Sequence, residues 1–208
     1  MQCRNILYCV FLFIAAPGLS QKDPAADATT ITKITVIVPG VSYEKRVGRQ
    51  QTLQVQAFAS IDFGIGYSSS FGTTSFLHTS PAVGLQYRYY YNAERRSRIG
   101  KRTAMNSMNY VAPLYTMVFS SWSISDAYLG EEKRRPIHSV RFAWGFQRNY
   151  ENRFSIDINA GPGINFAKTT LYDQNDQPIG RKTASAFAIG IQVRIGCWLN
   201  RRNNSSLR

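Results

Sequence analysis

The sequence predicts an all-β fold, an eight-stranded antiparallel transmembrane β-barrel of the up-and-down type, and three observations support this prediction. Apolar residues recur at every second position through successive segments, as on one face of a strand. The positions between them carry Gln, Arg, Asp and Asn, so the polar face is predicted to point inward. Tight turns alternate with longer connections, which is typical of outer-membrane barrels with periplasmic turns and extracellular loops.

The N-terminus has the features of a secretory signal peptide over residues 1–20. Arg4 supplies a positive charge, residues 6–16 form an apolar run, and Gly18 and Ser20 give a small-x-small pattern that predicts cleavage before Gln21. The apolar run is shorter than the roughly 20 residues of a membrane-spanning helix. An exported protein is therefore expected.

Composition narrows the choice of partner and compartment. Cleavage removes Cys3 and Cys9, which leaves Cys197 with no disulfide partner, and the net charge falls from +13 to +12 because residues 1–20 hold one Arg and no acid. No aromatic-and-basic recognition motif accompanies this charge, so nucleic acid is not the expected partner. Outer-membrane lipids and lipopolysaccharide are the anionic partners expected to balance this positive charge. No later segment resembles a membrane helix, and lipid tolerates only helices and closed barrels.

The barrel domain is predicted to span residues 30–200, between a polar linker at 21–29 and a polar tail at 201–208. The first strand, 30–38, places Ile34 and Val36 on one face, and the second runs from Val41 to Gly48. The third strand alternates from Leu53 to Tyr67 without a break. An even number of strands is required if both termini are periplasmic.

The fourth and fifth strands flank a basic connection. Val83, Leu85, Tyr87, Tyr89 and Tyr91 are predicted to face outward, and Gln86 and Arg88 inward, after a polar loop at residues 68–80. Residues 94–102 are expected to form a short basic turn. The fifth strand, 108–120, has a less regular alternation, and we expect its outward residues to be Met108, Tyr110, Ala112, Leu114 and Val118.

The last three strands form the clearest hairpins. Phe142 and Trp144 are expected outward on the sixth strand and Ile156 and Ile158 on the seventh, with a tight turn near Glu151. A turn centred on Glu151 would set Arg141 opposite Gly161, and one centred on Asn152 would set it opposite Gly163. Long loops are expected at 121–136 and 168–182. The eighth strand places Phe187, Ile189, Ile191, Val193 and Ile195 outward.

One family resemblance accompanies this pattern. It rests on Tyr89-Tyr90-Tyr91-Asn92, Arg95-Arg96, Gly100-Lys101, Thr103 and the run from Asn106-Ser107 to Asn109-Tyr110, with residues 39–44 and 144–150 on either side. These segments resemble the small outer-membrane β-barrel proteins of Bacteroidetes-type bacteria, a largely uncharacterised family. The resemblance implies the barrel fold and the cell outer membrane, and it brings no catalytic or ligand-binding residues.

The interior of the predicted barrel is expected to hold a polar network. An eight-stranded barrel is just wide enough inside for side chains to fill, and charges removed from water need partners. A lumen plugged in this way predicts a structural or surface-interaction role. The protein is then expected to be a monomer whose partners are the membrane lipids and the barrel-assembly machinery. A narrow small-solute channel is the alternative if the network is loose. The charged residues expected in this network are Glu44, Arg46, Asp62, Arg88, Arg141, Asp157 and Arg194.

An enzymatic alternative rests on His78 and Ser80. Their His-x-Ser spacing loosely resembles that of outer-membrane lipid A deacylases, with Glu131 or Glu132 available to orient a histidine. A serine nucleophile needs an adjacent base held by a third group, and here His78 is expected in an ordinary loop whose neighbours do not match those enzymes. Lipid modification therefore stands as the second function. No metal site and no cofactor motif stand out.

Overall fold

The computed structural model describes residues 27–68, 72–121, 133–173 and 177–200. Side chains are described for all of these except residues 62–68 and 72–78. The expected signal peptide at 1–20, most of the linker and the tail at 201–208 lie outside the described residues.

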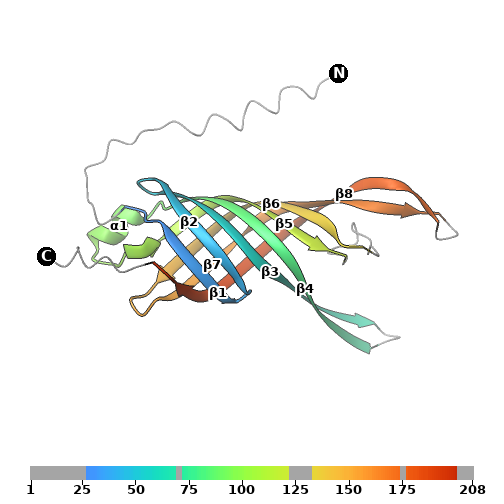
Figure 1. The fold of residues 1–208 in the computed structure, drawn as a ribbon, viewed down its shortest axis with the longest axis horizontal. Helices are drawn as coiled ribbons and strands as arrows, with labels where there is room; N and C mark the ends of the chain where they lie inside the picture. Colours follow the sequence, from blue (N-terminus) through green and yellow to red (C-terminus); the bar gives the residue numbers. More distant parts are fainter. Residues whose placement is uncertain (1–26, 69–71, 122–132, 174–176, 201–208) are drawn as a thin grey trace, which may run out of the picture.

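Eight antiparallel strands form one sheet that closes on itself, which confirms the all-β class and the strand count (Figure 1). Each strand pairs with the next in sequence, and β8 pairs with β1 to complete the ring. The predicted first strand is present and is the shortest at 7 residues. The strands are β1 (Ile31–Ile37), β2 (Gly40–Gly48), β3 (Gln51–Ser68), β4 (Gly72–Tyr89), β5 (Asn109–Ser120), β6 (Arg135–Asn149), β7 (Phe154–Tyr172) and β8 (Pro178–Trp198).

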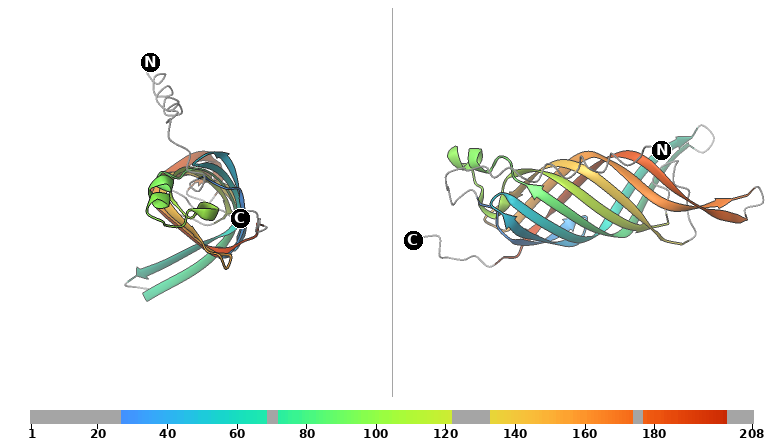
Figure 2. Two further views of the ribbon diagram at one scale, coloured as in Figure 1. Left: turned by 90° about the vertical axis from the view of Figure 1, so that its left-hand side faces the viewer. Right: turned by 90° about the horizontal axis from the view of Figure 1, so that it is seen from above.

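The ring has two different ends. One, the turn end, carries the β2–β3 and β6–β7 turns, the start of β1 and the end of β8 (Figure 1). At the opposite hairpin end, β3–β4 and β7–β8 extend well beyond the neighbouring strands (Figures 1 and 2). The predicted loops at 68–80 and 168–182 are therefore wrong, because β4 begins at Gly72, β7 runs to Tyr172 and β8 begins at Pro178.

These extensions escaped prediction for a physical reason. A hairpin that projects into water satisfies its backbone hydrogen bonds by pairing its own two strands. Such a hairpin needs no apolar face. The alternation of apolar and polar residues in the sequence can therefore end before the strand pairing does. Register is nevertheless complete, with Ser68 paired to Gly72 and Leu171 to Gly180.

Alternate residues on the outer surface form an aliphatic and aromatic belt. Every strand except β5 shows the predicted alternation among its described side chains, with apolar residues outward and polar ones inward. The belt consists of large apolar side chains that remain exposed on the outside of the ring. Its members include Val41, Tyr43, Leu53, Val55, Ile61, Val83, Leu85, Tyr87, Val140, Phe142, Trp144, Ile164, Phe187, Ile189 and Ile191.

The face assignment of β5 is wrong. Tyr110, Ala112 and Leu114 are buried inside the ring, and Val111 and Tyr115 lie on the outward positions. Both faces of this strand are apolar, so hydropathy does not choose between them. The choice is made by the Tyr110 hydroxyl, which donates a 2.7 Å hydrogen bond to Asp157 inside the ring.

The basic connection between β4 and β5 is not a short turn. It holds a helix, α1 (Ala93–Arg98), and a 3₁₀ turn, η2 (Ala104–Asn106), which lie across the mouth of the ring at its turn end (Figure 2). Neither of these described helices is long or apolar enough to cross a membrane. The connection is anchored by a buried cluster of Ala28, Tyr90, Ala93, Met108, Tyr110 and Ala112.

Candidate functional site

Charged side chains from five strands meet inside the turn-end half of the ring. Asp157 on β7 is the centre of one group: its Oδ2 lies 2.8 Å from Arg88 Nη2 and 3.1 Å from Arg194 Nη2. Lys33 on β1 adds a third cation, with Nζ at 3.6 Å. All four side chains are almost fully buried, so their charges are compensated mainly by one another.

Glu44 on β2 is the second buried acid. Its Oε2 lies 3.5 Å from Lys33 Nζ and 3.7 Å from Arg88 Nη1. Its Oε1 accepts hydrogen bonds from Tyr90 Oη at 2.5 Å and Asn106 Nδ2 at 2.7 Å. Thr52 Oγ1 donates to the same atom at 2.8 Å. The η2 segment is thus tied directly to the charged interior.

Neutral amides fill the space between the charges. Gln147 Oε1 accepts hydrogen bonds from Lys33 Nζ and from Arg88 Nη1, each at 2.6 Å. Gln86 Oε1 accepts two bonds from Arg88, and Gln56 accepts one from Arg194. We call this cluster the polar plug; it consists of Lys33, Glu44, Gln54, Gln56, Gln86, Arg88, Tyr90, Asn106, Tyr110, Gln147, Asp157 and Arg194.

The plug brings together four of the expected charged residues: Glu44, Arg88, Asp157 and Arg194. Lys33 was missed, although it alternates with the outward Ile34 and the sequence therefore held the signal. Asn106 was also missed, because η2 has no strand periodicity to mark an inward residue. The side chain of Asp62 lies outside the described residues.

Arg46 is not part of the plug, which corrects the expectation. Near the turn end, its exposed guanidinium pairs with Asp27 at 2.6 Å. Partial burial acts to raise the pKa of Asp27, but the hydrogen bonds from Arg46 and Arg49 outweigh it and hold that pKa below its usual value. Arg46 is at an inward-facing position of β2, as predicted. It lies so close to the turn end, however, that the ring does not enclose its side chain.

Arg141 lies six residues before the plug residue Gln147 on β6, toward the hairpin end. It pairs in register with Gly163, one of the two glycines predicted to oppose it. Its side chain crosses Gly163 on β7 and reaches Gly190 on β8, where a Cβ atom would overlap the guanidinium. No described carboxylate lies within ion-pair distance of it, so its expected acidic partner is not found among Asp157 and Glu44.

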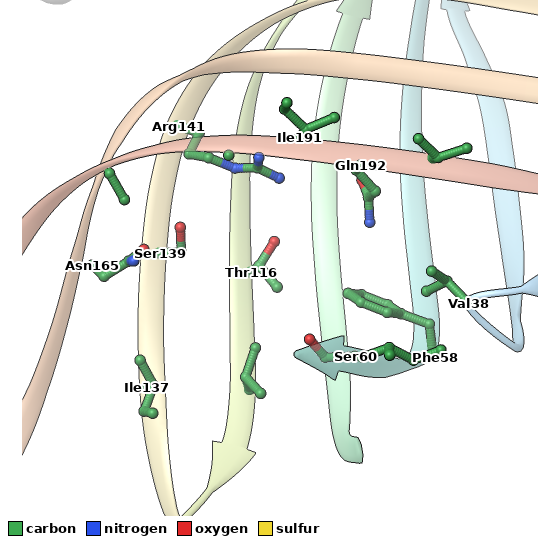
Figure 3. A pocket seen from close by; sticks show the side chains of 15 residues that line it. Val38, Phe58, Ser60, Thr116, Ile137, Ser139, Arg141, Asn165, Ile191 and Gln192 are labelled. Atoms are coloured by element: carbon green, nitrogen blue, oxygen red, sulfur yellow. The ribbon is translucent and has the colours of Figure 1, made fainter. Parts of the chain in front are cut away.

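A cavity of about 250 Å³ surrounds the Arg141 guanidinium (Figure 3). It is bounded by side chains of mixed character, with hydroxyls and amides facing the guanidinium across the ring. Ser60, Thr116, Ser139, Asn165 and Gln192 supply the polar wall, and Phe58 part of the apolar one. The chemistry of this lining is hydrogen bonding and charge, with no nucleophile and base paired among the described side chains.

The catalytic candidates are placed differently from the prediction. His78 and Ser80 belong to β4, so the expected loop around them is wrong. Ser80 is fully buried inside the ring, and its Oγ has no hydrogen-bond partner among the described side chains. Backbone register sets His78 opposite Asp62, but both side chains lie outside the described ones. The described structure gives Ser80 no activating base.

No three His, Cys, Asp or Glu residues among the described ones are grouped so that they could hold a metal ion. Comparison with known proteins adds no precedent: no family model, no curated protein and no solved structure matches this chain.

Proposed function

We propose that the ring is a transmembrane β-barrel of the bacterial outer membrane, with a structural or surface-interaction role and an interior closed by the polar plug. The observation that carries the proposal is the reversed polarity of the ring. Large apolar side chains face outward while Glu44, Arg88, Asp157 and Arg194 are buried inside. Water would penalise such an apolar outer surface, whereas hydrocarbon stabilises it.

Strand length and aromatic placement support the same environment. A tilted transmembrane strand needs about 9–11 residues, and β4 and β7 have 18 and 19, so their surplus would project into water. Outward Tyr91 and Trp144 meet near the turn end through a 2.7 Å hydrogen bond, with Tyr89 and Tyr150 also exposed there. Tyr and Trp side chains are favoured at membrane–water interfaces, where they form aromatic girdles around such barrels.

The plug favours a closed barrel over a small-solute channel. Arg88 on β4 donates hydrogen bonds across the ring, to Gln147 on β6 and to Asp157 on β7. Moving ions through this half would require breaking several buried ion pairs, each of which is costly to open. The α1–η2 connection adds a second barrier, because Asn106 bonds to Glu44 and to the chain at Thr29.

The proposed orientation places the turn end in the periplasm and the hairpin end outside the cell. The start of β1 and the end of β8 both lie at the turn end, as expected for barrels with periplasmic termini. The barrel-assembly machinery and the lipids of the membrane, including lipopolysaccharide, are then the proposed partners of a monomeric barrel. The outward hairpins are the surfaces left for contact with other molecules.

Membrane fractionation tests this proposal. The mature chain is expected to begin at Gln21, to remain with the outer membrane after washing with high salt and alkali, and to change its migration on a denaturing gel when boiled. A periplasmic soluble protein from the same cells provides the control. Recovery of the chain in the soluble periplasmic fraction would refute the proposal.

A further inference from the structure

A groove on the outer surface at the hairpin end has a composition unlike the rest of the belt. It encloses about 800 Å³ and is lined by the start of β6 and by residues of the β7–β8 hairpin, the hairpin that extends at the right of Figure 1. We call it the basic groove. Its lining residues are Lys133, Arg134, Arg135, Pro136, His138, Phe166, Ala167, Lys168, Thr170, Arg181 and Thr183.

The basic groove coincides with a change of polarity on the outward face. On β7 the outward residues change from Ile164 and Phe166 to Lys168. Lys168 pairs in register with Thr183 and Thr170 with Arg181, so the cations of β7 and β8 are neighbours. On β6, Val140 is followed toward the same end by His138 and Pro136, and Arg134 comes just before the strand. Three adjacent strands therefore exchange apolar for cationic residues at one level.

Four exposed cations of the basic groove have no described counter-charge. Lys133, Arg134, Lys168 and Arg181 are exposed, and no described carboxylate lies within ion-pair distance of any of them. This differs from the turn end, where Arg46 pairs with Asp27 and Arg102 with Glu151. Four positive charges left together on one outer face favour an anionic ligand with more than one charge.

The floor of the groove is aromatic and ordered. The rings of His138 and Phe166 stack with centroids 5.2 Å apart and an interplanar angle of 18°. Tyr115 lies on the other side of His138, with its hydroxyl 2.6 Å from Nδ1. The ligand side facing this floor must therefore be apolar or able to stack, while its charged side meets Lys168 and Arg181.

We propose that the basic groove binds the phosphorylated headgroup of an outer-leaflet lipid, with the phosphates on the four cations and the start of the acyl region against Phe166 and the adjoining belt. The inference rests on the proposed function, since it names the partner of the same outer surface. Arginine suits this role because its guanidinium forms paired hydrogen bonds to phosphate oxygens. A lysine beside it supplies a second, more mobile charge.

The test uses the full mature chain folded into neutral detergent micelles. Binding of a diphosphorylated glycolipid is compared with binding of the same lipid after phosphate removal and of zwitterionic phosphatidylcholine. The variant Lys168→Gln with Arg181→Gln removes two cations of the groove. Its matched control, Lys101→Gln with Arg98→Gln, removes one lysine and one arginine from exposed positions at the turn end.

The parent is expected to prefer the diphosphorylated lipid, and the groove variant to bind it about 25-fold more weakly, at roughly fivefold for each basic residue near an anionic surface. The control pair should bind like the parent. Equal losses in both pairs, no loss in the groove pair, or equal binding of the zwitterionic lipid would overturn the inference. Competition by millimolar inorganic phosphate alone would also overturn it, because the site would then recognise a free ion.

Flotation of both variants with lipid vesicles separates this inference from the proposed function. Variants that float but keep full affinity refute the groove and leave the membrane barrel standing. A parent that fails to float, yet loses affinity in micelles only through the groove pair, refutes the membrane placement and leaves the lipid-phosphate site standing.

Discussion

Replacing Gly190 with leucine should destabilise the ring through one identified side chain, Arg141. A Cβ at Gly190 meets three atoms of Arg141, its Nη1, Cζ and Cδ, and no backbone atom is nearer than these. Gly161, its cross-strand neighbour, differs, because a Cβ there meets the backbone of Phe142 and Ala143. The two substitutions therefore overpack the same interior against different partners.

Overpacking of this kind costs about 1–3 kcal/mol, and Gly190→Leu should fall in that range. In an Arg141→Ala background the leucine enters space that the arginine has left, so its cost should drop below about 0.5 kcal/mol. The resulting coupling energy of about 0.5–3 kcal/mol matches the range measured for contacting residues. Gly161→Leu is the control, and its cost should be the same with and without Arg141.

Urea unfolding from detergent micelles, followed by tryptophan fluorescence, measures all five variants and the parent. Two results would refute the reasoning: a Gly190→Leu variant as stable as the parent, or a cost for Gly190→Leu that Arg141→Ala does not reduce. Either would mean that the guanidinium does not cross the ring interior from β6 to β8.

Three further predictions concern the plug, the orientation and the enzymatic alternative. Asp157→Asn removes the acid shared by three buried cations, and the same unfolding assay should show a loss of about 3–5 kcal/mol, with an unchanged stability arguing against the plug. In a cysteine-free background, Gly180→Cys should react with an impermeant maleimide on intact cells and Ser97→Cys should not; the opposite result would invert the topology. Replacing His78 and Ser80 with alanine should leave the lipid A mass spectrum unchanged, since Ser80 is buried inside the ring; loss of an acyl-chain cleavage would restore the enzyme hypothesis.

The sequence predicts those parts of the fold that face two different environments. Strands such as β3 and β6 alternate between the belt and the interior, so their class, face and approximate bounds follow from hydropathy alone. The same reasoning found Arg141 and its opposing Gly163, because cross-strand parity restricts the register to a few choices.

The remaining features depend on contacts that periodicity does not encode. Tyr110 turns inward because its hydroxyl reaches Asp157, and Asn106 does so from a segment without strand character. The bounds of β4, β7 and β8 were wrong for a different reason, since these strands continue beyond the residues whose sequence alternates with a period of two. Membership of the plug was predicted from charge and parity, and Arg46 was wrongly included because parity says nothing about distance from the end of the ring.

Lipid contact along β8 tests the membrane barrel most directly. A fluorescent probe attached to single cysteines at Ile189 and at Ala188, in a Cys197→Ser background, reports two neighbouring positions on opposite faces of the strand. Ile189 is 72% exposed on the belt, whereas Ala188 borders the interior cavity. We predict that lipids brominated on their acyl chains quench the probe at Ile189 strongly and the probe at Ala188 weakly. Equal quenching at both positions, or quenching at Ile189 by a water-soluble quencher alone, would contradict the account.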